Sequence, residues 1–138
     1  MRSSIPPAVS DPVRILLVED NKVFREALEL LLGLRSDVEV VAAVGDGPEA
    51  VSAAADLHPD VVVLDFRLPG MDGVQVTSAV KAACPDTAVL CLTATASGAE
   101  TDALIAAGAV ACLRKDQELD EIVAAIHSAS AGRLARAE

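Results

Sequence analysis

The sequence contains no tryptophan, no tyrosine and only two phenylalanines among its 138 residues. Its core must therefore be aliphatic, and flat aromatic surfaces on which bases or sugars could stack are largely missing. Basic residues are also few, since 11 Lys and Arg stand against 21 Asp and Glu and give a net charge of −10. An acidic chain of this kind repels phosphate backbones, which argues against direct binding of nucleic acid.

Membrane-spanning runs and paired cysteine motifs are missing too. The longest uncharged segments, residues 87–99 and 103–113, fall short of the ~20 apolar residues that cross a bilayer. The three cysteines, Cys84, Cys91 and Cys112, are odd in number and form no CxxC motif, so we expect free thiols and a cytoplasmic protein. Residues 1–12 hold three prolines and no apolar stretch, so they are expected to form a flexible leader rather than a signal peptide.

Apolar runs of strand length alternate along the chain with segments of helical period. The runs predict five strands, at residues 13–18, 38–44, 61–64, 88–92 and 110–113. The helical segments lie at residues 21–34, 48–57, 73–83 and 98–107, with a last helix from 119 that fades by about 131. Runs without polar alternation indicate parallel strands covered on both faces. We therefore expect one α/β domain at residues 13–131, flavodoxin-like and doubly wound, with five parallel strands in the order 2-1-3-4-5 and a tail at 132–138.

Polar residues lie just after four of the predicted strands. They are Glu19 and Asp20 after the first, Asp65 after the third, Thr93 after the fourth and Lys115 after the fifth. In this topology the carboxyl ends of these strands meet in one crevice. Three carboxylates there suit Mg²⁺, and an aspartate beside that ion can form an aspartyl phosphate. Taken singly, each residue is compatible with an ordinary turn or cap, and it is their joint occurrence that favours a phosphoryl site.

Four motifs around these residues carry a family resemblance. They are residues 16–21 (LLVEDN), 64–73 (LDFRLPGMDG), 92–94 (LTA) and 113–115 (LRK). In this order they resemble the receiver domains of two-component response regulators, over about residues 13–131. Within that family they are most similar to the branch that often carries a helix-turn-helix output domain.

The resemblance implies a role for each matching residue. Asp65 matches the aspartate that accepts a phosphoryl group from the phosphohistidine of a sensor kinase or phosphotransfer protein. Asp20 and Asp65 match direct Mg²⁺ ligands, Glu19 matches an acid that acts through water, and the backbone carbonyl of Arg67 matches a further ligand. Thr93 and Lys115 match the hydroxyl and the ammonium group that bind the phosphoryl oxygens. Such a domain assists only its own phosphorylation and dephosphorylation, so the chain is predicted to be a signalling domain rather than an enzyme.

One departure from the family concerns the switch. The family places Tyr or Phe three residues before the lysine, and this chain has Cys112 there. With Thr93 and Cys112 as its switch residues, we expect weak coupling, through residues 93–98 and the following helix, to a partner or a second copy.

Other functions on the same fold fit less well. A phosphatase of the haloacid-dehalogenase type needs a second acid two residues after the nucleophile, where this chain has Arg67. A flavin carrier needs a Ser/Thr-rich phosphate loop and aromatic residues, and a receiver that has lost phosphorylation would not keep all five site residues. Only nine residues, 130–138, follow the last helix as predicted, so no helix-turn-helix fits, and a stand-alone receiver and a piece of a longer regulator both remain open. Neither His58 nor His127 has a partner that indicates catalysis, and both are expected at the surface.

Overall fold

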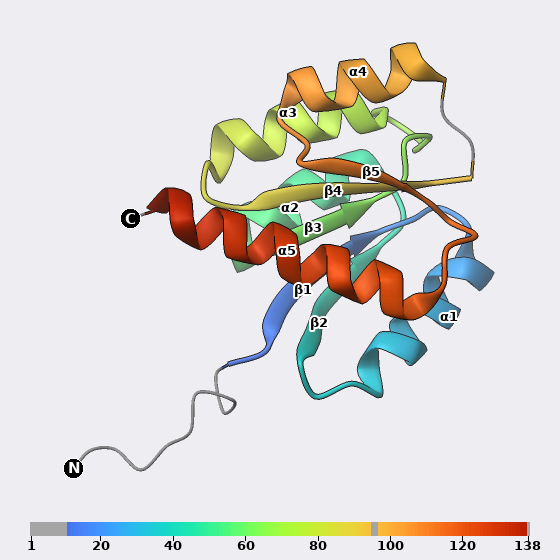
Figure 1. The fold of residues 1–138 in the computed structure, drawn as a ribbon. Helices are drawn as coiled ribbons and strands as arrows, with labels where there is room; N and C mark the ends of the chain where they lie inside the picture. The colour runs from blue at the N-terminus through green and yellow to red at the C-terminus, as the bar shows by residue number, and fades with distance from the viewer. Residues whose placement is uncertain (1–10, 95–96, 138) are drawn as a thin grey trace.

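A computed structural model describes residues 11–94 and 97–137 of the chain, and in it one parallel sheet forms the centre (Figure 1). The strand order is β2-β1-β3-β4-β5, which confirms the predicted flavodoxin-like, doubly wound topology. The strands are β1 (Val13–Val18), β2 (Val38–Val44), β3 (Val61–Leu64), β4 (Ala88–Thr93) and β5 (Ala111–Arg114). The predicted leader lies outside the described residues except for Asp11 and Pro12, and the domain limits remain a prediction.

Five helices cover the two faces of this sheet. They are α1 (Lys22–Gly33), α2 (Gly47–Leu57), α3 (Gly73–Ala83), α4 (Gly98–Ala107) and α5 (Leu119–Ala137). Leu28 and Leu32 of α1 and Ile126 of α5 pack in one buried cluster, and α2, α3 and α4 pack in the other. Figure 1 shows α5 crossing one face of the sheet with α2 and α3 behind it. Alternate residues of each strand enter the two clusters, which explains why the strands are apolar throughout.

The helix starts follow from polar residues placed just before them. The side chains of Asn21, Asp46, Asp72 and Ser97 each accept a hydrogen bond from the backbone N–H three residues later. This contact satisfies a donor that the helix itself leaves unpaired. Among the described helices, none is long and apolar enough to cross a membrane.

The last strand and the last helix differ from the prediction. β5 starts at Ala111 and ends at Arg114, one residue later than the apolar run, because the ladder pairs Leu90 with Ala111 and Thr93 with Arg114. α5 continues to Ala137 rather than fading near residue 131. The segment is rich in Ala and holds no proline, and a single Gly132 weakens a helix by only about 1 kcal/mol.

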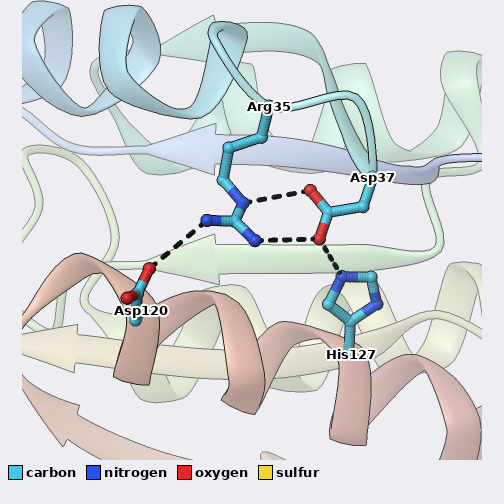
Figure 2. Close-up of polar contacts among 4 residues, drawn as sticks. All are labelled: Arg35, Asp37, Asp120 and His127. Carbon is cyan, nitrogen blue, oxygen red and sulfur yellow. Dashed lines mark hydrogen bonds and ion pairs between the residues drawn. The ribbon is translucent and has the colours of Figure 1, made fainter.

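An ionic cluster ties α5 to the connection between α1 and β2, and Figure 2 shows its four side chains. Arg35 binds Asp37 through two parallel contacts of 3.0 and 3.1 Å, and its third nitrogen lies 3.3 Å from Asp120 Oδ1. His127 Nε2 lies 2.8 Å from Asp37 Oδ2. His127 lies at the surface as expected, with its side chain 42% exposed. Its contact with Asp37, which the sequence did not indicate, reaches from α5 to a residue 90 positions earlier in the chain. We call these four residues the α5 cluster.

Candidate phosphoryl-acceptor site

Backbone hydrogen bonds fix the residues that follow the strands at one edge of the sheet. Glu19 N–H donates to Val44 O at 3.0 Å, and Asp65 N–H donates to Val18 O at 3.0 Å. Lys115 N–H donates to Thr93 O at 2.8 Å. These bonds continue the parallel ladder one residue beyond the strands, so their side chains start from rigid backbone.

Lys115 joins two of the acids directly. Its Nζ lies 2.6 Å from Glu19 Oε1 and 3.3 Å from Asp65 Oδ2. Both carboxylates are buried, with Glu19 2% and Asp65 8% exposed, whereas Asp20 is exposed. The structure thus brings one cation and two buried anions into contact, and leaves the third acid at the rim.

The three acids converge as the sequence predicts. One carboxylate oxygen from each of Glu19, Asp20 and Asp65 lies within 4.8 Å of the others. Hard oxygen donors of this number and charge fit Mg²⁺, which takes one or two carboxylates and fills its remaining positions with water and phosphate oxygens. The donor set therefore fits the ion that the sequence predicts.

Burial sets the ionisation of this group. Loss of solvent raises the pKa of Glu19, and the hydrogen bonds from Lys115 and from Asn21 N–H only partly offset that rise. For Lys115, burial acts to lower the pKa, but the hydrogen bond to Glu19 and the charges of Asp65 and Glu19 outweigh it and raise the pKa. Lys115 is thus held as a cation between two carboxylates, of which Glu19 is poorly solvated.

The loop after Asp65 is held against the start of α3. Gly73 N–H donates to Phe66 O at 2.6 Å, and a Cβ at Gly73 would lie 2.9 Å from Phe66 Cα and 3.2 Å from Asp65 O. Only glycine fits such a close approach. The Arg67 side chain is 71% exposed and contacts Glu100 Oε2 at 3.3 Å, so its side chain takes no part in the acid group.

Two residues of α1 complete the site and were not predicted from the sequence. Lys115 Nζ lies 4.7 Å from the centre of the Phe24 ring, a distance at which the ring face attracts an ammonium group. Arg25 Nη1 donates to Glu19 O at 2.7 Å. In the sequence, only the position of Phe24 and Arg25 in the first turn of the helix after the acidic pair could have indicated that they lie near the site.

Thr93 and Cys112 lie on β4 and β5, the neighbouring strands on one side of β3. Thr93 is 4% exposed at the end of β4, and Cys112 is half-buried and packs against the cluster of α2, α3 and α4. Cys112 pairs in register with Cys91, whose thiol has its pKa raised first by burial and then by Cys112. Of the predicted coupling segment 93–98, residues 95 and 96 lie outside the described residues.

Comparisons with known proteins agree on the kind of domain. A model of the response regulator receiver domain matches residues 15–127. The transcriptional regulatory protein LiaR of Bacillus subtilis is 34% identical over 120 residues, which are 87% of this chain and 57% of LiaR. The chain therefore spans less than two thirds of that relative's length.

Two solved structures are similar over almost their full length. The signal receiver domain of the putative response regulator NarL from Mycobacterium tuberculosis has a TM-score of 0.84 and 36% identity, covering 89% of this chain and 99% of that one. The receiver domain of the sensor histidine kinase PA1611 from Pseudomonas aeruginosa has a TM-score of 0.74 and 30% identity, covering 87% of this chain and 98% of that one. The latter structure carries a magnesium ion in its active-site cleft.

Proposed function

The chain belongs to the response regulator receiver domains, close to the NarL and LiaR regulators, and we propose that Asp65 is its phosphoryl acceptor. In this proposal a sensor kinase or phosphotransfer protein supplies the phosphoryl group from a phosphohistidine, in the cytoplasm. The observation that carries the proposal is Lys115 Nζ bridging Glu19 and Asp65 inside a group of three acids at the strand ends.

The reaction forms one bond and breaks one. A carboxylate oxygen of Asp65 attacks phosphorus, the P–N bond to the donor imidazole breaks, and the imidazole nitrogen keeps the electron pair and takes up a proton. Lys115, 3.3 Å from Asp65 Oδ2, supplies positive charge to the phosphoryl oxygens, and the Thr93 hydroxyl supplies a donor. Phe24 and Glu19 keep the ammonium group in place before the phosphoryl group arrives.

Mg²⁺ would be held by Asp20 and Asp65 directly, by Glu19 through water and by the backbone carbonyl of Arg67. Its charge would offset the repulsion between the acids and the incoming phosphoryl oxygens. The close packing of Gly73 against the Asp65 loop supports this assignment, because it fixes the backbone that carries both Asp65 and Arg67. The relative from P. aeruginosa, with magnesium in its cleft, supports the same choice of ion.

Phosphorylation would act through contacts with a partner, an output domain or a second copy. The LiaR and NarL relatives are transcriptional regulators about 1.8 times as long as their matched region, since 57% of their length is matched. The output of this chain is therefore part of the proposal. A new phosphoryl group would draw Lys115 and Thr93 toward it and so move β4, β5 and α4. Cys112 has less volume than an aromatic ring, so we propose that it transmits little of this change.

Intact-mass measurement after incubation with a small phosphodonor and Mg²⁺ tests the acceptor. Wild-type protein should gain one phosphoryl group, and Asp65→Asn should gain none. Asp56→Asn, which removes an exposed carboxylate on α2, is the matched control and should behave as wild type. Equal phosphorylation of Asp65→Asn and wild type would show that another residue is the acceptor.

Cys112→Ala tests the proposed minor role of Cys112 in the switch. Phosphorylation-dependent self-association or partner binding, measured by light scattering, should be unchanged in this variant. If the coupling disappears while Asp65 still becomes phosphorylated, Cys112 belongs to the switch.

A further inference from the structure

A thiol and an imidazole lie together at the edge of the sheet opposite the acids. His58 follows α2 and Cys84 follows α3, and Cys84 Sγ lies 3.8 Å from His58 Nδ1. Both residues line a cavity of about 380 Å³, and Asp60 and Asp86 line it as well. We propose that this cavity binds a borderline divalent cation such as Zn²⁺, through Cys84, His58 and Asp86.

The distance between the two donor atoms suits this ion. With Zn–S near 2.3 Å and Zn–N near 2.05 Å, a tetrahedral angle puts the two ligand atoms about 3.6 Å apart. The observed 3.8 Å is close to that edge length. The Cys84 thiol also donates to Ala54 O at 3.4 Å, and a metal ion would replace this bond when the thiol loses its proton. A thiolate and an imidazole together select zinc-like ions over Mg²⁺, which prefers oxygen donors.

The backbone holds both donors in place. His58 has φ 47°, a left-handed conformation, and is fixed by its N–H bond to Ala54 O at 2.9 Å and by Arg14 Nη1, which donates to His58 O at 2.9 Å. Cys84 N–H donates to Val80 O at 2.7 Å, and Cys84 O accepts from Thr87 N–H at 3.0 Å. Backbone hydrogen bonds therefore hold the two turns that carry the thiol and the imidazole.

A hydrogen bond between the two turns sets their spacing. Thr87 Oγ1 donates to Pro59 O at 2.8 Å, and Thr87 is 3% exposed. Lys81 Nζ donates to Pro85 O and Thr87 O, both at 2.8 Å, and closes the second turn. Because Lys81 is bound to these carbonyls, its charge is directed at the turn backbone.

Asp86 is the better placed of the two acids to supply the third ligand. Asp60 Oδ2 already accepts the backbone N–H of Arg14 at 2.9 Å. Asp86 is exposed and makes no hydrogen bond or ion pair with any residue that the structure describes, so its carboxylate is available to turn into the cavity. Within the described part of the chain three acidic, thiol or imidazole ligand atoms already converge only at Glu19, Asp20 and Asp65. The proposed site is thus a preformed pair that Asp86 and water complete.

Titration with Co²⁺ tests the site, because a thiolate ligand gives cobalt a near-ultraviolet charge-transfer band and tetrahedral coordination strengthens its visible bands. The titration uses the whole chain, reduced, with excess Mg²⁺ present to occupy the acidic group. One equivalent of Co²⁺ should produce the band, and Zn²⁺ should displace it.

Variants assign the ligands. Cys84→Ser keeps a hydrogen-bond donor, and His58→Asn keeps a residue that tolerates the left-handed conformation, so both should fold. Each should weaken binding by more than the roughly 10- to 100-fold that loss of a partner merely orienting a ligand costs, and Cys84→Ser should abolish the band. Asp86→Asn should weaken binding less, because water can replace a carboxylate.

Matched controls use another cysteine and the second histidine. Cys112→Ser and His127→Gln should bind Co²⁺ as wild type does. No band in wild type, or a band that survives Cys84→Ser, would overturn the proposal, and loss of the band in Cys112→Ser would move the site to the Cys91 and Cys112 pair. Phosphorylation of Asp65 at the other end of the sheet should proceed in Cys84→Ser, so this test and the test of the acceptor fail independently.

Discussion

Two regions of this molecule contain one strong cation bridging two carboxylates, and they differ chiefly in burial. At the strand ends Lys115 bridges Glu19 and Asp65, with side chains 18%, 3% and 10% exposed. In the α5 cluster Arg35 bridges Asp37 and Asp120, with side chains 34%, 37% and 91% exposed. The same arrangement of charges is therefore buried at the strand ends and exposed to water in the α5 cluster.

The direction of the pKa shifts shows what burial changes. In the α5 cluster the hydrogen bonds from Arg35, and then from His127, hold the pKa of Asp37 well below its ordinary value, so its charged form is favoured. At the strand ends burial raises the pKa of Glu19 in spite of Lys115. The exposed cluster is a closed arrangement that fastens α5, whereas the buried one has more negative charge than its single lysine satisfies. That excess is what a site for a metal ion and a phosphoryl group requires.

The largest expected effect comes from removing the buried cation. Lys115→Met should lower the free energy of unfolding by about 2–3 kcal/mol, because it leaves two buried carboxylates without a partner. Adding Mg²⁺ should restore part of the loss, since the ion supplies positive charge to the same oxygens. Urea unfolding with and without Mg²⁺ measures both effects.

The exposed Lys22→Met at the start of α1 is the control for Lys115→Met. It should change the free energy of unfolding by less than about 0.5 kcal/mol. Equal effects of the two variants would mean that Lys115 is not the buried partner of Glu19 and Asp65.

Removing Asp20, the acid at the rim of the site, should change the free energy of unfolding in the opposite direction to Lys115→Met. Asp20→Asn should weaken Mg²⁺ binding by about tenfold or more, yet raise the free energy of unfolding without Mg²⁺ by on the order of 1 kcal/mol, because it relieves repulsion. Isothermal titration and thermal unfolding measure the two quantities on one sample. A variant that binds Mg²⁺ as wild type does would remove Asp20 from the metal site.

Removing a charge from the α5 cluster should lower the thermal stability, as expected for an exposed ion pair. Asp37→Asn should lower Tm by about 1–3 °C at pH 7, with no effect on Mg²⁺ binding. The pKa of Asp37 is lower in the folded protein than in the unfolded chain. Its ionised carboxylate therefore stabilises the fold above the unfolded-state pKa, and this stabilisation is lost as the pH falls below about 4. The Tm difference between wild type and Asp37→Asn should therefore shrink in acid. A difference that stays constant from pH 7 to pH 3 would contradict the assignment.

The smallest effect is expected at the far end of the same cluster. His127→Gln should lower Tm by less than about 1 °C, because Arg35 keeps both of its bonds to Asp37 and the histidine side chain is 42% exposed. Combined with Asp37→Asn it should add almost nothing, since its partner is already changed. Additive effects in a double-mutant cycle would place the role of His127 elsewhere.

Much of the fold follows from the sequence because the strands are apolar on both faces. The segment VVVL at residues 61–64 has no polar alternation, and it lies at the centre of the sheet, buried throughout. At the sheet edge the pattern is less informative: Val110 is 39% exposed and precedes β5 rather than starting it. An edge strand pairs with only one other strand, so its apolar side chains are less buried. Their positions therefore indicate the first and last residues of the strand poorly.

The candidate site divides in the same way. Residues that directly follow strands, such as Asp65 and Lys115, are brought together by topology, and topology can be predicted from the chain order. Contacts that long side chains make between different helices and strands cannot be predicted from the chain order. Arg25 to the Glu19 carbonyl and His127 to Asp37 depend on the packing angles of α1 and α5, which no local pattern encodes.

The contact between Phe24 and the Lys115 ammonium group has an experimental consequence. Because the protein has no tryptophan and no tyrosine, it contributes almost no intrinsic fluorescence of its own. Phe24→Trp would place a single indole where the ring now lies 4.7 Å from Lys115 Nζ, and a nearby positive charge shifts indole emission. Any displacement of that lysine toward an incoming anion would then change the emission wavelength and intensity of this one indole. The change could be followed in real time and without an added label.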